Sequence, residues 1–525
     1  MLLLLFKYPL LVELALLIPL SARSSVAYPT SNPASQQSAV RSVRQPGKVD
    51  PDYKTLLWLV ALGFFMQSLD STIVNTALPS IAHNLGESPL QMQSVVVAYV
   101  LSVAAVIPAS GWIADRIGIR YAFLAAIVIF SVASLCCALS QSLNQLIAAR
   151  VLQGVGGAML LPVGRLAILR IVPRPQFLAA MSFITIPGLI GPLVGPALGG
   201  WLVEVATWHW IFLINLPIGV IGALLTLRVM PILKNPAVPS FDLSGYVLLL
   251  VGMVCLSLAM DGLSDRSMVA VMLILLMMGI AAVVGYVFHA HRHSNALFRA
   301  DLFQNRTFSI GVFGNLFARL GGGCIAFLMP LMLQLALGYS PVEAGLMMMP
   351  LILGAMTIKR TITPLIQRFG YRRVLVSNTL LVGLGIASFA LVSNDMPLWL
   401  KMIHFFVFGM VNSVQFTAMN TLTLKDLEPR YASSGNSFLS MVMMLSMSLG
   451  VAAAAAILSG FTAHFQSMPV QSVHNQMQVL SAFHATFICM GIITMAATWI
   501  FWQLEPEDKQ CKRHEQAEVG LPESS

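Results

Sequence analysis

The chain has 525 residues, of which 57% are apolar and 10% are charged, and its mean hydropathy is +0.81. Soluble globular domains carry about 25% charged residues, so this composition excludes a soluble enzyme. The formal net charge is +9, but the basic residues lie between apolar runs, which indicates membrane topology and not nucleic-acid binding. We therefore expect an all-α polytopic membrane protein.

Residues 1–52 are predicted to be an N-terminal extension. Residues 10–20 form a mostly apolar run that resembles a signal peptide but is interrupted by Glu13. The following segment contains Arg41 and Arg44, which should remain inside the cell, whereas signal cleavage would place them outside. We favour a dispensable extension over a working signal, and we expect residues 21–50, rich in Ser, Pro and Gln, to be disordered.

The rest of the chain contains about fourteen apolar stretches long enough to cross a bilayer. In chain order they are 56–79, 92–112, 121–139, 146–166, 177–200, 210–230, 245–261, 269–289, 309–335, 344–362, 373–393, 398–418, 434–459 and 480–503.

The orientation follows from the loops, because basic residues are disfavoured in translocated loops. One alternate set of loops holds only Arg266 and Lys401. The other set holds Arg116, Arg120, Arg165, Arg170, Arg174, Arg228, Lys234, Arg292, Arg299, Arg306, Arg368, Arg372, Arg373, Lys425 and Arg430. We predict a protein of the bacterial inner membrane with both termini cytoplasmic and with residues 506–525 as a cytoplasmic tail.

The chain also repeats itself. Residues 85–89 (LGESP) recur as residues 337–341 (LGYSP), and residues 115–120 (DRIGIR) recur as residues 367–372 (QRFGYR), both displaced by 252 residues. The repeat predicts two six-helix halves, 53–231 and 301–505, with a two-helix insertion and a cytoplasmic loop at 232–300. Parallel repeats of this kind hold a substrate between the halves and alternate access by rocking.

Five motifs carry a family resemblance. They are residues 69–79 (LDSTIVNTALP), 111–120 (GWIADRIGIR), 150–157 (RVLQGVGG), 191–200 (GPLVGPALGG) and 208–217 (WHWIFLINLP). Over about residues 53–505 the chain resembles the fourteen-helix drug:proton antiporter family of the major facilitator superfamily. This resemblance implies the major facilitator fold and proton-driven efflux.

The motif at 111–120 is predicted to be a gating loop. Gly118 permits a tight turn, and Asp115 can accept hydrogen bonds from helix termini or from an arginine. We expect Gly111, Asp115, Arg116, Gly118 and Arg120 to latch the two halves on the cytoplasmic side. The alternative is that the arginines only determine topology.

The motif at 191–200 brings glycines and prolines into the fifth predicted span. They permit close helix contact and interrupt the helical hydrogen bonds. Simple helix packing would account for them, whereas the resemblance implies a seam that controls the transition between outward and inward states. The residues concerned are Gly191, Pro192, Gly195, Pro196, Gly199 and Gly200.

Charged residues inside apolar spans are costly and indicate function. Asp70 and Arg150 are the candidates for proton coupling, because burial and a neighbouring arginine act oppositely on the ionisation of an aspartate. The alternatives are that Asp70 makes a structural hydrogen bond to Asn75 or to backbone, and that Arg150 merely holds two helices together. Asn75 and Gln153 are candidates for substrate binding.

Arg319 is a further candidate for substrate binding, since it lies deep in an apolar run just before three glycines. Lys359 and Arg360 lie near the inner end of their span, where long side chains can extend to the cytoplasm. The excess of buried cations over Asp70 opens a second possibility for the substrate, an organic anion such as a carboxylate metabolite or its metal chelate.

The sequence thus predicts a proton-driven exporter of small molecules, of the multidrug type, and not an enzyme. The partners expected are a small-molecule substrate, protons and the lipid bilayer, with a periplasmic adaptor left open. No nucleic acid or nucleotide is expected, because the chain has no G-x-x-x-x-G-K-[ST] loop, and no cofactor or metal is expected, because no Cys-x-x-Cys pair occurs. A non-transporting membrane sensor on the same fold is the less favoured alternative.

Overall fold

The structure is a computed structural model that describes residues 51–504, except 173, 234–239, 262–268, 294–295, 428–431 and 467–474. These residues belong to one compact unit, Gly47–Ser525. The predicted extension before residue 51, the tail at 506–525 and three of the topology residues (Lys234, Arg266 and Arg430) lie outside the described part. Within it, all regular elements are helices, as expected where backbone groups must be hydrogen-bonded without water.

The N-terminal half contains seven helical elements. They are α3 (Pro51–Leu85), α4 (Gln93–Ile117), α5 (Ile119–Ala138), α6 (Leu143–Ile171), α7 (Arg174–Val205), α8 (Trp210–Leu213) and α9 (Asn215–Val229). The central insertion follows, with α10 (Leu243–Asp261), α11 (Val269–Arg292) and the short 3-10 helix η3 (Ala300–Gln304).

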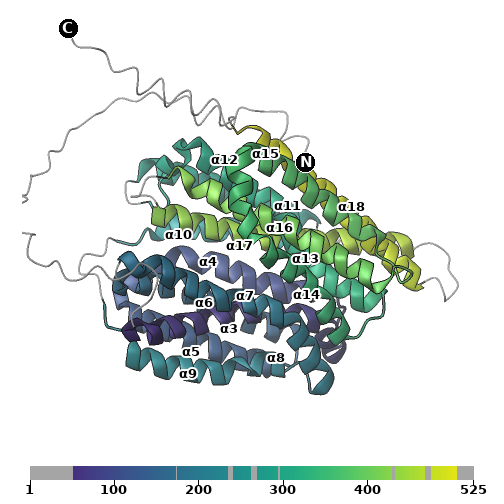
Figure 1. Cartoon of the computed structure of the whole chain (residues 1–525), viewed down its shortest axis with the longest axis horizontal. Coiled ribbons are helices and arrows are strands. Elements are labelled where there is room, and N and C mark those ends of the chain that lie inside the picture. The colour runs from purple at the N-terminus through teal and green to yellow at the C-terminus, as the bar shows by residue number, and fades with distance from the viewer. Residues whose placement is uncertain are drawn as a thin grey trace, which may run out of the picture. The chain divides into compact units, whose positions relative to one another are not determined.

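The C-terminal half begins after this insertion. Its elements are α12 (Arg306–Ala318), α13 (Leu320–Leu331), the π-helix η4 (Met332–Ala336), α14 (Pro341–Thr357), α15 (Lys359–Ser388), the 3-10 helix η5 (Phe389–Leu391), α16 (Leu398–Lys425), α17 (Ala432–Gln466), α18 (Asn475–Ala496) and α19 (Thr498–Trp502). In Figure 1, α3 to α9 group together in colours from purple to teal, and α4 of this group lies against α10 and α17.

Twelve described helices are long and apolar enough to cross a membrane, so the predicted count of fourteen is not confirmed. The two remaining spans correspond to shorter apolar stretches, Ile190–Val205 in α7 and Pro341–Thr357 in α14. The span predicted at 344–362 is divided, because α14 ends at Thr357 and the chain continues as α15. Lys359 and Arg360 are therefore the first residues of α15, and both are exposed.

The internal repeat is visible in the backbone. Four glycines of the described chain have positive φ: Gly86 (70°), Gly118 (96°), Gly338 (72°) and Gly370 (76°). They form two pairs, each separated by the 252 residues found in the sequence, and glycine is the residue that adopts this conformation without strain. We call the end of the helix bundle with Gly86 and Gly338 the Gly86 end, and the opposite end the Gly118 end.

The two halves meet closely at the Gly86 end, where α7 packs against α14. A Cβ atom on Gly200 would lie 2.2 Å from the carbonyl oxygen of Pro341, and one on Gly345 would lie 2.2 Å from that of Pro196. Only glycine permits this approach. Two hydrogen bonds also join the halves: Gln334 donates to the carbonyl of Thr76 (2.9 Å), and the amide of Val342 donates to Glu204 (3.0 Å).

Candidate functional site: a buried ion pair in the N-terminal half

Asp70 on α3 is fully buried and forms an ion pair with Arg150 on α6. Arg150 Nη1 lies 2.6 Å from Asp70 Oδ2, while Gln153 Nε2 donates to Oδ1 at 2.8 Å and Asn215 Nδ2 donates to Oδ1 at 3.2 Å. The carboxylate thus receives three hydrogen bonds, and α3, α6 and α9 each contribute to the site.

A second layer of hydrogen bonds orients these donors. Gln153 accepts from Arg150 Nη1 (2.6 Å), and its amide also donates to Ser134 Oγ on α5 (2.7 Å). Ser134 in turn donates to the carbonyl of Phe130 (2.9 Å). Gln153 is thereby held between the two charges, with an acceptor directed at Arg150 and a donor directed at Asp70.

The guanidinium of Arg150 also lies over an aromatic ring. Its Cζ is 4.1 Å from the centroid of Tyr99, and its Nε donates to the carbonyl of Val95 at 3.4 Å. The Tyr99 hydroxyl is buried and has no hydrogen-bond partner in the described part of the chain. Removing one partner of a buried ion pair such as Asp70–Arg150 typically lowers the stability of the folded protein by about 3–5 kcal/mol.

The structure brings together Asp70, Arg150 and Gln153 but leaves Asn75 outside the group. Asn75 is 8% exposed, and its Oδ1 lacks a hydrogen-bond partner in the described chain. The expected alternative of an Asp70–Asn75 bond is replaced by a bond from Asn215. Asn215 was visible in the sequence as a polar residue of the motif at 208–217, but its spacing did not reveal its partner. No feature of the sequence pointed to Ser134 or Tyr99 as part of this group.

The loop motif engages its own half of the protein. Asp115 pairs with Arg170 on α6, and Arg120 donates to the carbonyl of Leu227 on α9. Gly118 has the expected turn conformation, Arg116 is exposed, and a Cβ atom on Gly111 would meet nothing within 4 Å. Asp115 therefore contacts its own half in this structure and does not make the predicted contact between the halves.

The glycine motif of α7 packs against two different helices. Cβ atoms on Gly191 and Gly195 would each lie 2.3 Å from a side-chain oxygen of α3, and one on Gly199 would lie 2.5 Å from the Ile73 carbonyl. Gly200 and the carbonyl of Pro196 instead face α14 of the other half. α7 thus packs on α3 with one face and on α14 with the other, and Pro192 lies on the same helix.

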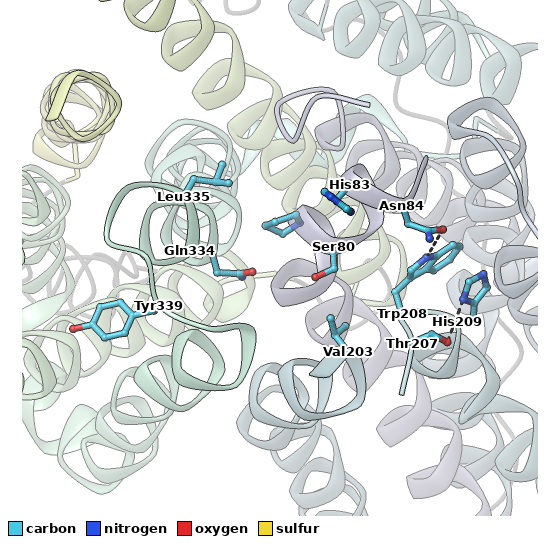
Figure 2. Close-up of a pocket in the computed structure, with 11 residues that line it drawn as sticks. Ser80, His83, Asn84, Val203, Thr207, Trp208, His209, Gln334, Leu335 and Tyr339 are labelled. Atoms are coloured by element: carbon cyan, nitrogen blue, oxygen red, sulfur yellow. Dashed lines mark hydrogen bonds between the residues drawn. The ribbon is translucent and has the colours of Figure 1, made fainter. Parts of the chain in front are cut away.

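A cavity of about 490 Å³ opens between the halves at the Gly86 end. Figure 2 shows its lining residues, among them Gln334 and Ser80 from opposite halves. Trp208 donates to Asn84 (3.0 Å) and stacks on His209, with ring centroids 3.8 Å apart. The cavity shares no lining residue with the Asp70 group. Its lining comes from both halves, so it lies at the interface between them.

Arg319 stands apart from the ion pair, at the break between α12 and α13. It is 7% exposed. Its Nη2 donates to Asn315 (3.2 Å) and to Asn420 (3.4 Å), and its Cζ lies 4.1 Å from the ring centroid of Phe416. In the described chain no group of three or more His, Cys, Asp or Glu residues could hold a metal ion.

Known proteins with similar sequences and folds give the family. The chain matches the Major Facilitator Superfamily over residues 60–242 and 311–523, and the gap between the two matches contains α10, α11 and η3. It is 51% identical over 465 residues to the putative multidrug resistance protein MdtD of Serratia proteamaculans, covering 88% of this chain and 96% of that protein. It is 54% identical over 447 residues to the protein of the same name from Yersinia enterocolitica, covering 85% and 94%.

Solved structures share the fold at low sequence identity. A bacterial homologue of the human lysosomal transporter Spinster, inward-facing and unoccupied, has a TM-score of 0.63 at 15% identity, covering 87% of this chain and 97% of that one. A D-xylose–proton symporter has a TM-score of 0.61 at 14% identity, covering 87% and 98%. The family expected from the motifs is confirmed: the chain belongs to the major facilitator superfamily.

Proposed function

We propose that this protein exports small molecules of the multidrug type across the bacterial inner membrane in exchange for protons, with Asp70 as the proton-binding group. The buried group formed by Asp70, Arg150 and Gln153 carries this proposal. It is the one ion pair in the described chain whose two side chains are both almost fully buried. The proton gradient across the membrane supplies the energy for export. The chain is a transporter and not an enzyme.

Proton binding at Asp70 is coupled to the positions of the helices. Three donors on α6 and α9 hold the carboxylate on α3, so a proton that takes the place of one of these donors would loosen α3 from α6 or α9. Arg150 remains charged throughout, because arginine is not deprotonated in proteins. When Asp70 is neutral, Gln153 Oε1 still accepts from Arg150, so the guanidinium keeps a partner.

The close contact at the Gly86 end supports alternating access. We place this end outside the cell, from the distribution of basic residues, with both termini cytoplasmic and the halves at 53–231 and 301–505. The contact of Gly200 with Pro341 then closes the outer side, and rocking about this seam exchanges the two states. The loop with Asp115 lies on the cytoplasmic side and would latch the halves in the opposite state.

The driving force is sufficient for export. A membrane potential of 100 mV contributes about 2.3 kcal/mol per charge moved. That corresponds to a concentration ratio of about fiftyfold for one proton.

Everted vesicles test the proposal. Export of a panel of radiolabelled lipophilic drugs should require a pH gradient in the wild type and should be lost in Asp70→Asn, which keeps the shape of the side chain but cannot bind the proton. Glu87→Gln is the matched control, because Glu87 is an exposed acid of the same half. Export that persists in Asp70→Asn with an unchanged pH dependence would assign Asp70 to structure alone.

A further inference from the structure

The C-terminal half contains a buried cation without a counter-charge. Arg319 is 7% exposed, and none of the ion pairs among the described residues includes it. Arg150, the comparable cation of the N-terminal half, has Asp70. A buried charge is costly unless it is paired, so the position of Arg319 needs an explanation.

The hydrogen bonds of Arg319 leave part of the guanidinium unused. A guanidinium has five N–H donors, and both described bonds use Nη2. Nε is buried without a partner in the described chain. The acceptors are neutral amide oxygens, so they satisfy hydrogen bonds without neutralising the charge.

The neighbouring side chains are held in place. Asn315 donates to the carbonyl of Gly311 (2.9 Å) and to Thr423 Oγ1 (3.2 Å), and this fixes its Oδ1 toward Arg319. Phe416 lies under the guanidinium but remains 44% exposed. The site therefore combines a fixed cation with a partly uncovered aromatic ring.

The depth of the site argues against a lipid headgroup as the missing anion. Arg319 follows the start of α12 at Arg306 by thirteen residues, which is about 20 Å along a helix. That distance reaches well past the headgroup region of a bilayer whose apolar core is about 30 Å thick. The counter-charge is then expected to come from a ligand that enters the protein.

We propose that Arg319, with Asn420 and Phe416 beside it, binds the anionic group of a transported aromatic carboxylate. The planar guanidinium matches the two oxygens of a carboxylate, and the ring of Phe416 offers a stacking surface for the substrate. This inference rests on the proposed exporter function and names a substrate class for it.

Binding measured without a proton gradient tests the site separately from transport. The full-length chain in nanodiscs is titrated with radiolabelled benzoate, with its neutral analogue benzamide, and with the lipophilic cation tetraphenylphosphonium. Benzoate should bind the wild type, and benzamide should bind at least tenfold more weakly. Arg319→Gln should weaken benzoate binding at least tenfold, and Arg319→Lys should restore it only partly, because lysine cannot make the bidentate contact.

Arg373→Gln is the matched control, since Arg373 is an exposed arginine of the same half. It should bind benzoate like the wild type. The proposal is overturned if the wild type does not bind benzoate, if Arg319→Gln binds it unchanged, or if Arg319→Gln loses benzoate and tetraphenylphosphonium alike. Benzoate binding without proton-dependent export in everted vesicles would instead contradict the proposed function and leave the anion site standing.

Discussion

The carboxylate of Asp70 lies 2.6 Å from Nη1 of Arg150, although 80 residues separate the two in the chain. Both side chains are almost completely buried, and Gln153 bonds to each of them. This ion pair adds an electrostatic link to the packing of α3 against α6. Its strength therefore depends on whether a proton is present, which is the property that a coupled transporter requires.

A double-mutant cycle should expose this linkage. Arg150→Gln leaves Asp70 without its counter-charge and should lower stability by about 3 kcal/mol. Asp70→Asn combined with Arg150→Gln restores a neutral network, so the double variant should be more stable than the sum of the single changes predicts, by at least about 1 kcal/mol. Thermal unfolding of the purified variants measures this difference. Strictly additive effects would mean that the two residues do not interact in the folded protein.

The seam of α7 should tolerate no added methyl group on the face toward the other half. Gly200→Ala places a Cβ atom against the Pro341 carbonyl and should prevent closure at the Gly86 end, thereby reducing export at least tenfold. Gly195→Leu should block cycling as well, by wedging α7 away from α3. Gly460→Ala is the matched control, because its Cβ atom would meet nothing within 4 Å. Wild-type export by Gly200→Ala would show that the seam is incidental packing.

The orientation can be checked with single cysteines in a background without native cysteines. Cysteines at Arg170 or Arg299 should resist an impermeant thiol reagent in intact cells, because these positions belong to the basic set of loops. A cysteine at Gly338, at the Gly86 end, should react. Strong external labelling at Arg170 would reverse the assigned orientation.

Asp242 should stabilise the central insertion in a pH-dependent way. Burial favours its neutral form, but hydrogen bonds from Gly245 N (2.9 Å), Leu297 N (3.0 Å) and His289 Nε2 (2.8 Å) outweigh this and hold its pKa below the ordinary value. A carboxyl group whose pKa is lowered by folding contributes stability above its unfolded pKa, and this contribution is lost as the pH falls through the folded pKa.

Asp242→Asn should therefore reduce stability by about 2 kcal/mol at pH 7. The difference from the wild type should begin to shrink near pH 4, about the pKa of an unfolded aspartate, and should be lost as the pH falls further through the lowered folded pKa. Unfolding midpoints measured across this range provide the test. Asp301→Asn is a suitable control, because that carboxylate is more exposed. An equal difference at pH 3 and pH 7 would contradict the role of the charge.

The sequence by itself determined that the chain is an all-helical membrane protein, and it identified Asp70 and Arg150 as charges within apolar runs. Helix formation in a bilayer is local, because each helix satisfies its own backbone, so apolar length predicts it well. The displacement of 252 residues likewise predicted a backbone feature, since the repeated glycines occupy turns that favour glycine over other residues. Asp70 and Arg150 stood out because a charge in an apolar run is costly wherever its partner lies.

Only the tertiary structure decided which polar groups meet. Asn215 on α9 donates to Asp70, and Ser134 on α5 accepts from Gln153 beside it, while Asn75, on the same helix as Asp70, does not bond to the carboxylate. The break between α12 and α13 at Arg319 and the packing of α7 against both α3 and α14 were equally hidden. The reason is physical: transmembrane helices are apolar on nearly every face, so periodicity does not identify their neighbours. The small residues that permit close contact do not specify which helix makes it.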